Sequence, residues 1–479
     1  MIPLTLNDIA QATNGTVINA AAQDITINTV CTDSRTIEAG CLFIALQGDN
    51  FDAHQFIEQA ETAGAAILLV HRKIESKLPS ILVKDTRIAL GLLSAFVKQK
   101  ISGLKCAAIT GSNGKTTTKE LLSQILRQFS DADDSVLATA GNFNNDIGLP
   151  LTLLRLTAQN RFAVVELGAN HAGEIAYTAQ LAKPDVALIN NVLPAHLEGF
   201  GSLEGVAKAK GEIWSSLTSD GYAVVNLDAN FAEQYLQQLN QLGVKILTFS
   251  QNNQDANIFA SKLRFDPLGK AIFTLHLRRD SAVQTIDIHL NLAGKHNVSN
   301  ALAAAAMAVA LGCELDVISC GLNSVKQVAG RVNCNQVNEL VTVIDDTYNA
   351  NSASVKAAID LLGQYNGAHL LILGDMAELG LHSEKEHIAV GEYAAQQGIK
   401  QLLTVGTLTE QTSTAFKKGG KNSALHFSSK QQLITYLQKT LLQNSEKLTL
   451  LVKGSRGTKM EEIVACIPKL FKDADSETC

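Results

Sequence analysis

The sequence predicts an α/β protein of three domains: a small N-terminal α/β domain, a central domain built on a parallel sheet, and a C-terminal Rossmann-like, doubly wound domain. Three observations support this prediction. At 479 residues the chain is too long for one hydrophobic core. Short apolar, strand-like runs alternate with helical segments along most of the chain, which is typical of parallel sheets. One of these strands runs into a glycine-containing turn that opens a helix.

The composition is that of a globular protein, with 46% hydrophobic and 18% charged residues. The 40 Lys and Arg against 46 Asp and Glu give a net charge of −6 without a basic run, which argues against nucleic-acid and membrane partners. The eight cysteines form no C-x-x-C pair and indicate reduced thiols in a cytoplasmic protein. The N-terminus does not resemble a signal peptide, and the apolar run 301–311 is too short to span a bilayer.

The first predicted domain covers residues 1–84, the second residues 85–328 and the third residues 329–479. In the first, we expect helices at 6–13 and 55–63 and strands at 25–30, 42–46 and 66–70. In the second, we expect strands at 106–110, 162–167, 186–190 and 223–227, antiparallel hairpins across 257–292, and helices at 116–129 and after His296. In the third, we expect strands at 341–344, 370–373, 402–405 and 448–452 and helices at 354–362 and 384–396.

The segment AAITGSNGKTTTKELL carries the strongest functional signal. A strand, a tight glycine turn and a Lys-Thr pair that opens a helix form a P-loop, in which backbone N–H groups and the helix N-terminus attract phosphate. Lys115 can reach the outer phosphates of a nucleotide, and the Thr116 hydroxyl can bind Mg²⁺. The loop is the tighter G-x-x-G-K-T-T, because Ile109 stands where the common pattern has its first glycine. An ordinary strand-to-helix turn is the alternative, and the coincidence of all four features favours phosphate binding.

The sequence resembles the Mur ligase family of ATP-dependent amide ligases, which make peptidoglycan precursors. The resemblance covers nearly the whole chain and rests on segments that follow one another in the family's order. They are TDSRTIEAGCLFIALQGDNFDAHQFIEQAETAGA, TGSNGKTTTKELL, TAGNFNNDIGLPLTLL, VVELGANHAGEI, INNVLPAHLEGFGSLEGVAKAKGEIW, AGKHNVSNALAAAAMA, GRVN, VIDDTYNANSASVKAAI, LILGDMAELG and LVKGSRGTKME. The resemblance implies, in order along the chain, domains that bind a UDP-sugar, ATP and the incoming amino component.

Within the family, NVLPAHLEGFGS, DDTYNANS, GDMAELG and KGSR are similar to the member that joins D-alanyl-D-alanine to a UDP-N-acetylmuramoyl-tripeptide. The D-N-P-R signature of the member that adds the third amino acid is absent, and residues 377–380 read Ala-Glu-Leu-Gly in its place. The resemblance implies an acyl-phosphate intermediate and release of ADP and phosphate. It also implies a role in cell wall biogenesis and hence in cell shape and division.

The resemblance assigns most of the site to the nucleotide. The residues implied in ATP binding are Gly111, Ser112, Asn113, Gly114, Lys115, Thr116, Thr117, Asn145, Asn297, Asn300, Arg331 and Asp346. Among them, Arg331 is expected at the γ-phosphate and Asp346 at the ribose, while the asparagines offer both donors and acceptors to the base. Helix capping is the alternative for Asn297, and both roles can hold together.

The implied Mg²⁺ ligands are Thr116, Glu166, His196 and Lys210, the last as a carbamate formed with CO₂. Glu166 ends a predicted strand beside the P-loop, where a carboxylate suits a hard cation. An exposed strand-end glutamate, a structural loop histidine and a surface lysine are the alternatives. The family pattern selects Lys210 over Lys208, which lies on another face of the predicted helix. The expected catalytic set is Lys115, Glu166, His196, Lys210 and Arg331.

The organic substrates are assigned to a further group of residues: Ser34, Arg35, Asn144, Asn349, Asn351, Lys453, Ser455 and Arg456. Ser34 and Arg35 are expected at the UDP moiety. Lys453, Ser455 and Arg456 follow the last strand and are candidates for the carboxylate of the dipeptide, with a solvated loop as the alternative. Tyr348 stands where some relatives carry a lysine, and its role stays open.

Two other functions fit part of the sequence. A folylpolyglutamate-type ligase would share the P-loop and the lysine but not the N-terminal pattern, and a nucleotide-switch NTPase would not need GDMAELG or KGSR. The sequence does not distinguish lysine from diaminopimelate at the third position of the substrate peptide. We expect the protein to be a monomer.

Overall fold

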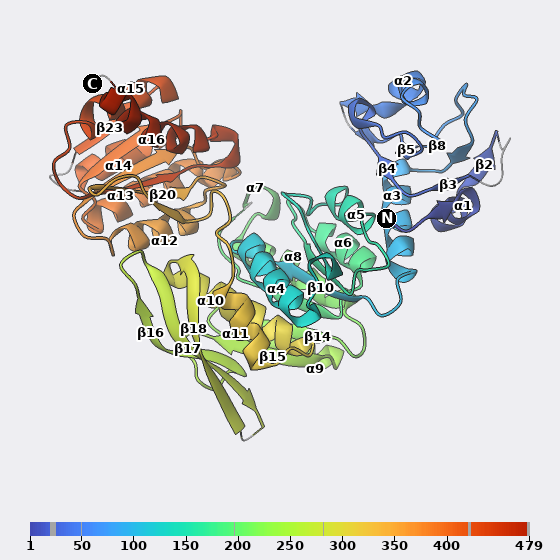
Figure 1. Ribbon diagram of the computed structural model, residues 1–479, viewed down its shortest axis with the longest axis horizontal. Helices are drawn as coiled ribbons and strands as arrows, with labels where there is room; N and C mark the ends of the chain where they lie inside the picture. The colour runs from blue at the N-terminus through green and yellow to red at the C-terminus, as the bar shows by residue number, and fades with distance from the viewer. Residues whose placement is uncertain (20–24, 49, 196, 281, 420–422, 477–479) are drawn as a thin grey trace.

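The structure is a computed structural model that describes residues 1–19, 25–48, 50–195, 197–280, 282–419 and 423–476. Figure 1 shows three lobes in chain order, with the N-terminal and C-terminal lobes at opposite ends of the central one. Each lobe contains a sheet with helices packed around it, so the predicted α/β fold class is confirmed. No helix in the described part of the chain is long and apolar enough to cross a membrane.

The N-terminal lobe is built on a five-stranded sheet of order β2-β9-β8-β5-β4, in which only β2 is antiparallel to its neighbour. Its elements are β1 (Leu4–Thr5), α1 (Leu6–Thr13), β2 (Thr16–Ile18), β3 (Thr26–Ile27), β4 (Val30–Cys31), η1 (Ser34–Thr36), β5 (Leu42–Ile44), β6 (Gln47–Gly48), β7 (Phe51–Asp52), η2 (Ala53–Phe56), α2 (Ile57–Thr62), β8 (Ile67–Val70) and β9 (Ser80–Leu82). The single strand predicted at 25–30 is two strands, because β3 pairs with β1 and β4 pairs with β5.

A buried histidine lies beside this sheet. The His54 side chain is 1% exposed, its Nδ1 lies 2.8 Å from an Asp52 carboxylate oxygen, and its Nε2 accepts from the His71 backbone N–H at 3.2 Å. An Nε2 that accepts a hydrogen bond carries no proton, so the imidazole is neutral with its proton on Nδ1. Burial lowers the pKa of His54, and the hydrogen bond with Asp52 opposes that shift without cancelling it.

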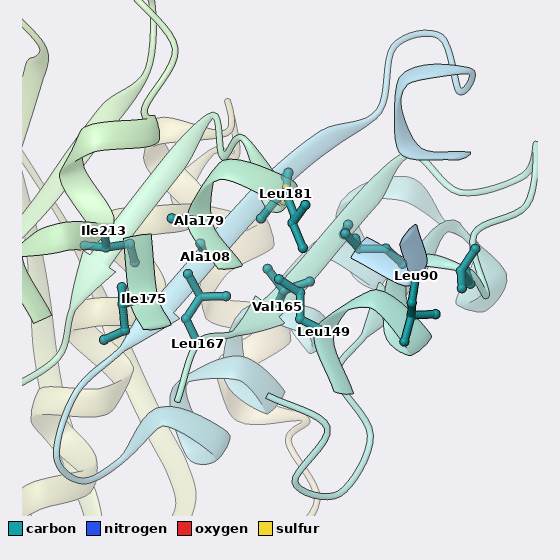
Figure 2. Close-up of a cluster of buried hydrophobic side chains, with 14 of the residues drawn as sticks. Leu90, Ala108, Leu149, Val165, Leu167, Ile175, Ala179, Leu181 and Ile213 are labelled. Atoms are coloured by element: carbon teal, nitrogen blue, oxygen red, sulfur yellow. The ribbon is translucent and has the colours of Figure 1, made fainter. Parts of the chain in front are cut away.

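Helix α3 (Thr86–Gln99) follows residue 84, where the sequence sets the first domain boundary. Asp85 caps it by accepting from the backbone N–H groups of Arg87 and Ile88. One hydrophobic cluster contains residues of the N-terminal lobe, α3 and the central sheet. Figure 2 shows part of this cluster, where Leu90 of α3 lies near Leu149 and Val165 of the central lobe. The boundary itself stays a prediction.

The central lobe holds a nine-stranded sheet of order β11-β12-β10-β13-β14-β15-β16-β17-β18. It is parallel from β11 to β16 and antiparallel from β16 to β18, which confirms the hairpins expected across 257–292. The strands are β10 (Lys105–Thr110), β11 (Val136–Ala138), β12 (Phe162–Glu166), β13 (Val186–Ile189), β14 (Tyr222–Asn226), β15 (Lys245–Ser250), β16 (Ile258–Phe265), β17 (Lys270–Arg279) and β18 (Ala282–Ala293). The helices are α4 (Lys115–Ser130), α5 (Gly148–Leu153), α6 (Glu174–Ala182), α7 (Leu197–Phe200), α8 (Leu203–Gly211), α9 (Ala232–Leu242), α10 (Lys295–Ala310) and α11 (Leu315–Asn323).

The C-terminal lobe holds a six-stranded sheet of order β19-β20-β24-β21-β22-β23, parallel except at β19. The strands are β19 (Asn333–Gln336), β20 (Val341–Asp346), β21 (Ala368–Gly374), β22 (Gln401–Val405), β23 (Ser423–Phe427) and β24 (Leu448–Lys453). The helices are α12 (Ser352–Leu362), α13 (Ser383–Gln396), α14 (Thr409–Lys418), α15 (Lys430–Leu441) and α16 (Glu461–Ser476). The neighbouring strands β20 and β24 bring their last residues, Asp346 and Lys453, side by side.

Candidate functional site

The P-loop joins β10 to α4. Gly114 has a φ of +79°, a conformation that suits glycine, and the first helical residue is Lys115. The Lys115 ammonium donates to the Gly111 carbonyl at 2.6 Å, so the lysine arches back over the loop. Burial lowers the pKa of Lys115; Glu166 opposes the shift and Arg331 adds to it.

Two asparagines that follow β13 hold the loop in shape. Asn190 and Asn191 both donate side-chain N–H groups to the Asn113 carbonyl at 3.0 Å, and Asn191 accepts from the Asn113 backbone N–H at 2.9 Å. Beside them, the Ser112 hydroxyl donates to the Leu193 carbonyl and accepts from the Leu193 N–H, each at 2.9 Å. Asn190 and Asn191 were not among the residues expected at the site. Their position at the carboxyl end of the strand next to β10 is the signal that could have identified them.

The asparagines of α10 extend this network. Asn300 accepts from Asn190 at 2.9 Å and donates to the Asn297 side chain at 2.9 Å, and Asn297 donates to the Ala293 carbonyl at 2.7 Å. Both amides are almost fully buried. Asn297 is not the N-cap of α10, which is Gly294. The two asparagines therefore brace the loop, and a contact with the nucleotide base stays a prediction.

Glu166 ends β12 with a side chain that is 2% exposed. Among the described residues, its Oε1 accepts no hydrogen bond, and the nearest cation is the Lys119 ammonium at 3.7 Å. Lys119 is itself buried on α4, where it donates to the Thr139 carbonyl at 2.6 Å and pairs with Glu120 at 2.7 Å. The exposed strand-end alternative for Glu166 is excluded by this burial.

Lys210 lies in the last turn of α8 and is buried, whereas Lys208 on the same helix is exposed. Burial, and then the positive charge of Lys115, hold the pKa of Lys210 well below its usual value. The surface-lysine alternative is therefore excluded for Lys210. His196, the other expected metal ligand, lies outside the described residues.

Residues of the C-terminal lobe reach the P-loop. An Arg331 Nη donates to the Thr116 hydroxyl at 2.8 Å, and Asn351 and Asn113 exchange side-chain hydrogen bonds of 2.7 and 3.3 Å. Asn351 also caps α12 by accepting from the Ser354 N–H. These contacts join positions more than 200 residues apart in the sequence.

The buried Lys453 ammonium donates to the Asp346 carboxylate at 2.5 Å and to the Asn349 carbonyl at 2.8 Å. These bonds hold the Lys453 ammonium against protein groups in the wall of the cavity. Ser455 accepts from the Ala377 N–H at 2.8 Å, which ties the loop after β24 to the loop after β21. Arg456 is exposed and pairs with Glu461 at 3.0 Å.

These elements enclose a cavity of about 650 Å³ between the central and C-terminal lobes. The predicted site residues that line it are Ser112, Asn113, Gly114, Lys115, Thr116, Thr117, Asn144, Asn145, Glu166, Lys210, Asn297, Asn300, Arg331, Asp346, Asn349, Asn351, Lys453, Ser455 and Arg456. Gly111 is not on its wall. Ser34 and Arg35 lie in the N-terminal lobe, where the 82% exposed Arg35 side chain pairs with Asp33.

The cavity suits an anionic ligand with a hard cation. Cations and backbone N–H groups at one helix end offer charge and donors to phosphate. The described residues contain no group of three His, Cys, Asp or Glu side chains set to hold a metal. The Glu166 oxygen without a hydrogen bond and the Thr116 hydroxyl are nonetheless oxygen ligands of the type that Mg²⁺ takes alongside phosphate.

Family models match three segments of the chain. Residues 26–98 match "Mur ligase family, catalytic domain", residues 109–308 match "Mur ligase middle domain" and residues 330–456 match "Mur ligase, glutamate ligase domain". The chain belongs to the Mur ligase family. The resemblance read from the sequence is thereby confirmed.

Individual Mur ligases match this chain over nearly all of its length. The UDP-N-acetylmuramoyl-tripeptide–D-alanyl-D-alanine ligase of Escherichia coli is 45% identical over 468 residues, 98% of this chain and 99% of the relative. A crystal structure of MurF from Acinetobacter baumannii superposes with a TM-score of 0.90 at 36% identity, covering 98% and 99% of the two chains. The MurF ligase of Thermotoga maritima in complex with ADP gives a TM-score of 0.80 at 26% identity, covering 93% and 98%.

Proposed function

We propose that this protein is an ATP-dependent ligase that joins D-alanyl-D-alanine to a UDP-N-acetylmuramoyl-tripeptide in peptidoglycan precursor synthesis. The observation that carries the proposal is a cavity in which the P-loop, a buried carboxylate and cations of two lobes meet. Ligases of that name are 45% and 41% identical to this chain over 98% of its length, which supports the choice of substrates. The N-terminal segment 26–98 argues against a folylpolyglutamate-type ligase, and GDMAELG and KGSR argue against a nucleotide switch.

Amide formation from a carboxylate is unfavourable in water, and ATP makes it possible. The tripeptide carboxylate attacks the γ-phosphorus of ATP, the bond to the β,γ-bridging oxygen breaks and ADP leaves, which gives an acyl phosphate. The amine of D-alanyl-D-alanine then attacks the acyl carbon and loses a proton, and inorganic phosphate leaves. The protein's part is positioning and charge neutralisation. Lys115, the P-loop N–H groups and Arg331 would hold the phosphates, and Asp346 would meet the ribose.

Thr116 and Glu166, together with His196, would hold Mg²⁺, which when bound offsets the repulsion between ATP and the substrate carboxylate. We propose that Lys210 is carbamylated: its neutral amine attacks CO₂, forms an N–C bond and releases a proton. Its burial and lowered pKa support this, because only the neutral amine reacts. The product is a carboxylate at the end of the lysine stem.

The dipeptide would be held by its carboxylate, which lies far from the reacting amine. Arg456 and Ser455, which both line the cavity, are the proposed contacts. Lys453 takes a changed role in this proposal, because its ammonium is already bonded to Asp346 and Asn349. It orients Asp346, and the dipeptide is left to the other two residues. Ser34 and Arg35 remain the proposed contacts for the UDP moiety.

The described cysteines are free thiols, which together with the use of ATP supports a cytoplasmic location. A monomer is proposed. The deciding experiment measures ADP release from the purified protein with ATP and Mg²⁺, adding UDP-N-acetylmuramoyl-tripeptide and D-alanyl-D-alanine singly and together. ADP should form only with both present, and mass spectrometry should detect the UDP-N-acetylmuramoyl-pentapeptide. Equal use of free D-alanine, or ADP release without either substrate, would refute the proposal.

A further inference from the structure

Two arginines of the cavity share one aromatic ring. The Arg331 guanidinium carbon lies 4.1 Å from the centre of the Tyr348 ring, and that of Arg456 lies 5.6 Å from it. Both distances fall within the range of about 6 Å over which a cation is attracted to an aromatic face. All three side chains line the cavity, so the two cation–π contacts lie at the proposed site itself.

We infer that Tyr348 is a positioning residue that sets the two guanidiniums for their separate anions, the phosphates at Arg331 and the dipeptide carboxylate at Arg456. The inference rests on the proposed function. The face of the ring carries no formal charge and no lone pair, so it attracts a guanidinium through its π-electrons and leaves the N–H groups free. A carboxylate at position 348 would instead occupy the donors that the substrates need.

The Arg331 guanidinium has a hydrogen-bond donor that is not used within the described part of the protein. One Nη is bonded to the Thr116 hydroxyl at 2.8 Å, while its buried Nε has no hydrogen-bond partner among the described residues. A buried donor without a partner costs free energy unless a ligand completes it. The ring and Thr116 thus fix the guanidinium, whose Nε–H no described protein group satisfies.

The backbone around Arg331 is built to keep this arrangement. Val332 has a φ of +57°, which is strained for a β-branched residue, and its side chain is buried in the core of the C-terminal lobe. The carbonyl of Gly330 accepts from the Tyr348 N–H at 3.0 Å, which joins the residue before Arg331 to the segment that carries the ring. The strained turn and the ring therefore position Arg331 together.

Substitutions at position 348 can separate the role of the aromatic ring from that of the phenol hydroxyl. No hydrogen bond of the Tyr348 hydroxyl is found among the described residues, so the conservative variant Tyr348→Phe keeps both cation–π contacts. Tyr348→Leu keeps an apolar side chain but removes the aromatic face. Tyr393→Leu is a matched control, because Tyr393 also contacts a cation, Lys356 at 5.6 Å, on the same lobe but away from the cavity.

The test uses full-length enzyme whose wild-type reaction has first been established, so that a wild type without ligase activity refutes the proposed function and not this inference. We expect Tyr348→Leu to lower kcat about tenfold and to raise KM for D-alanyl-D-alanine about threefold, with KM for the UDP substrate unchanged. Tyr348→Phe should restore the wild-type values, and Tyr393→Leu should show them.

Binding of a non-hydrolysable ATP analogue, measured by calorimetry, gives a second reading that does not depend on the identity of the organic substrates. It should weaken several-fold in Tyr348→Leu and not in Tyr348→Phe. Wild-type kinetics and binding in Tyr348→Leu would overturn the inference, as would an equal loss in Tyr348→Phe. Should Tyr348→Leu not fold, Tyr348→Gln replaces it, and the same two comparisons decide.

Discussion

Gly114→Ala tests whether the shape of the P-loop is set by the asparagine network beneath it. Gly114 has a φ of +79°, and a Cβ there would lie 2.4 Å from both Asn190 Nδ2 and Asn300 Oδ1. These two atoms are hydrogen-bonded to each other at 2.9 Å. Ordinary van der Waals contact begins at 3.4 Å, so each amide must retreat by 3.4 − 2.4 = 1.0 Å. The alanine also bears about 1–2 kcal/mol for its left-handed backbone.

A displacement of this size at the loop is sufficient to impair catalysis. A misplacement of about 1 Å costs on the order of 10²-fold in rate, which corresponds to about 2.7 kcal/mol of transition-state stabilisation. We therefore expect kcat/KM for ATP to fall about 100-fold in Gly114→Ala, measured by ADP release with both organic substrates saturating.

Gly103→Ala is the matched control. Gly103 has a φ of +76° but no atom within 4 Å of a Cβ built on it. The Gly103→Ala variant should lose the same ~1–2 kcal/mol of unfolding free energy, measured in urea, and keep the wild-type kcat/KM. Wild-type activity in Gly114→Ala would refute the reasoning about the network. Equal losses of activity in both variants would show that backbone strain, and not contact with the amides, is responsible.

Three further outcomes follow from buried titratable side chains. In the ADP-release assay, Lys210→Ala should be nearly inactive and partly restored by short carboxylic acids in the buffer, whereas Lys208→Ala should behave as wild type. An inactive Lys208→Ala beside an active Lys210→Ala would refute the carbamate. Lys119→Met should lose on the order of 3 kcal/mol in urea unfolding, because it leaves a buried carboxylate without its cation, and an unchanged midpoint would contradict this. Burial lowers the pKa of His54, so its contribution to stability is complete above pH 6.5 and is lost as the pH falls below it, at up to about 1.4 kcal/mol per pH unit. His54→Gln should flatten the fall of Tm between pH 7.5 and 5.5 and the exposed-site control His289→Gln should not; equal slopes in all three proteins would contradict the assignment.

The fold could be predicted where the pattern is local. Buried strands such as β10 and β12 are short apolar runs beside glycine turns, and the hairpins of β16–β18 alternate polar and apolar residues, so periodicity identifies both. Among the strands that were not expected, β15 reads KILTFS, whereas β11 and β23 have weaker patterns. β11 has three residues, and β23, which lies at a sheet edge, reads SALHF with only one buried residue. Their strand conformation depends on a neighbour that is distant in the sequence.

The site could be predicted as a set of residues but not as a set of roles. A motif identifies the kind of side chain, while the role depends on which of its polar atoms are already bonded. Asn300 and Lys453 look like ligand contacts in the sequence, yet their hydrogen-bonding groups are directed to other residues of the protein. Arg331 Nε and Glu166 Oε1 are the opposite case, because each is buried with no hydrogen-bond partner among the described residues. Leaving a buried polar group without a partner costs free energy, and a phosphate at Arg331 Nε and a cation at Glu166 Oε1 would offset that cost.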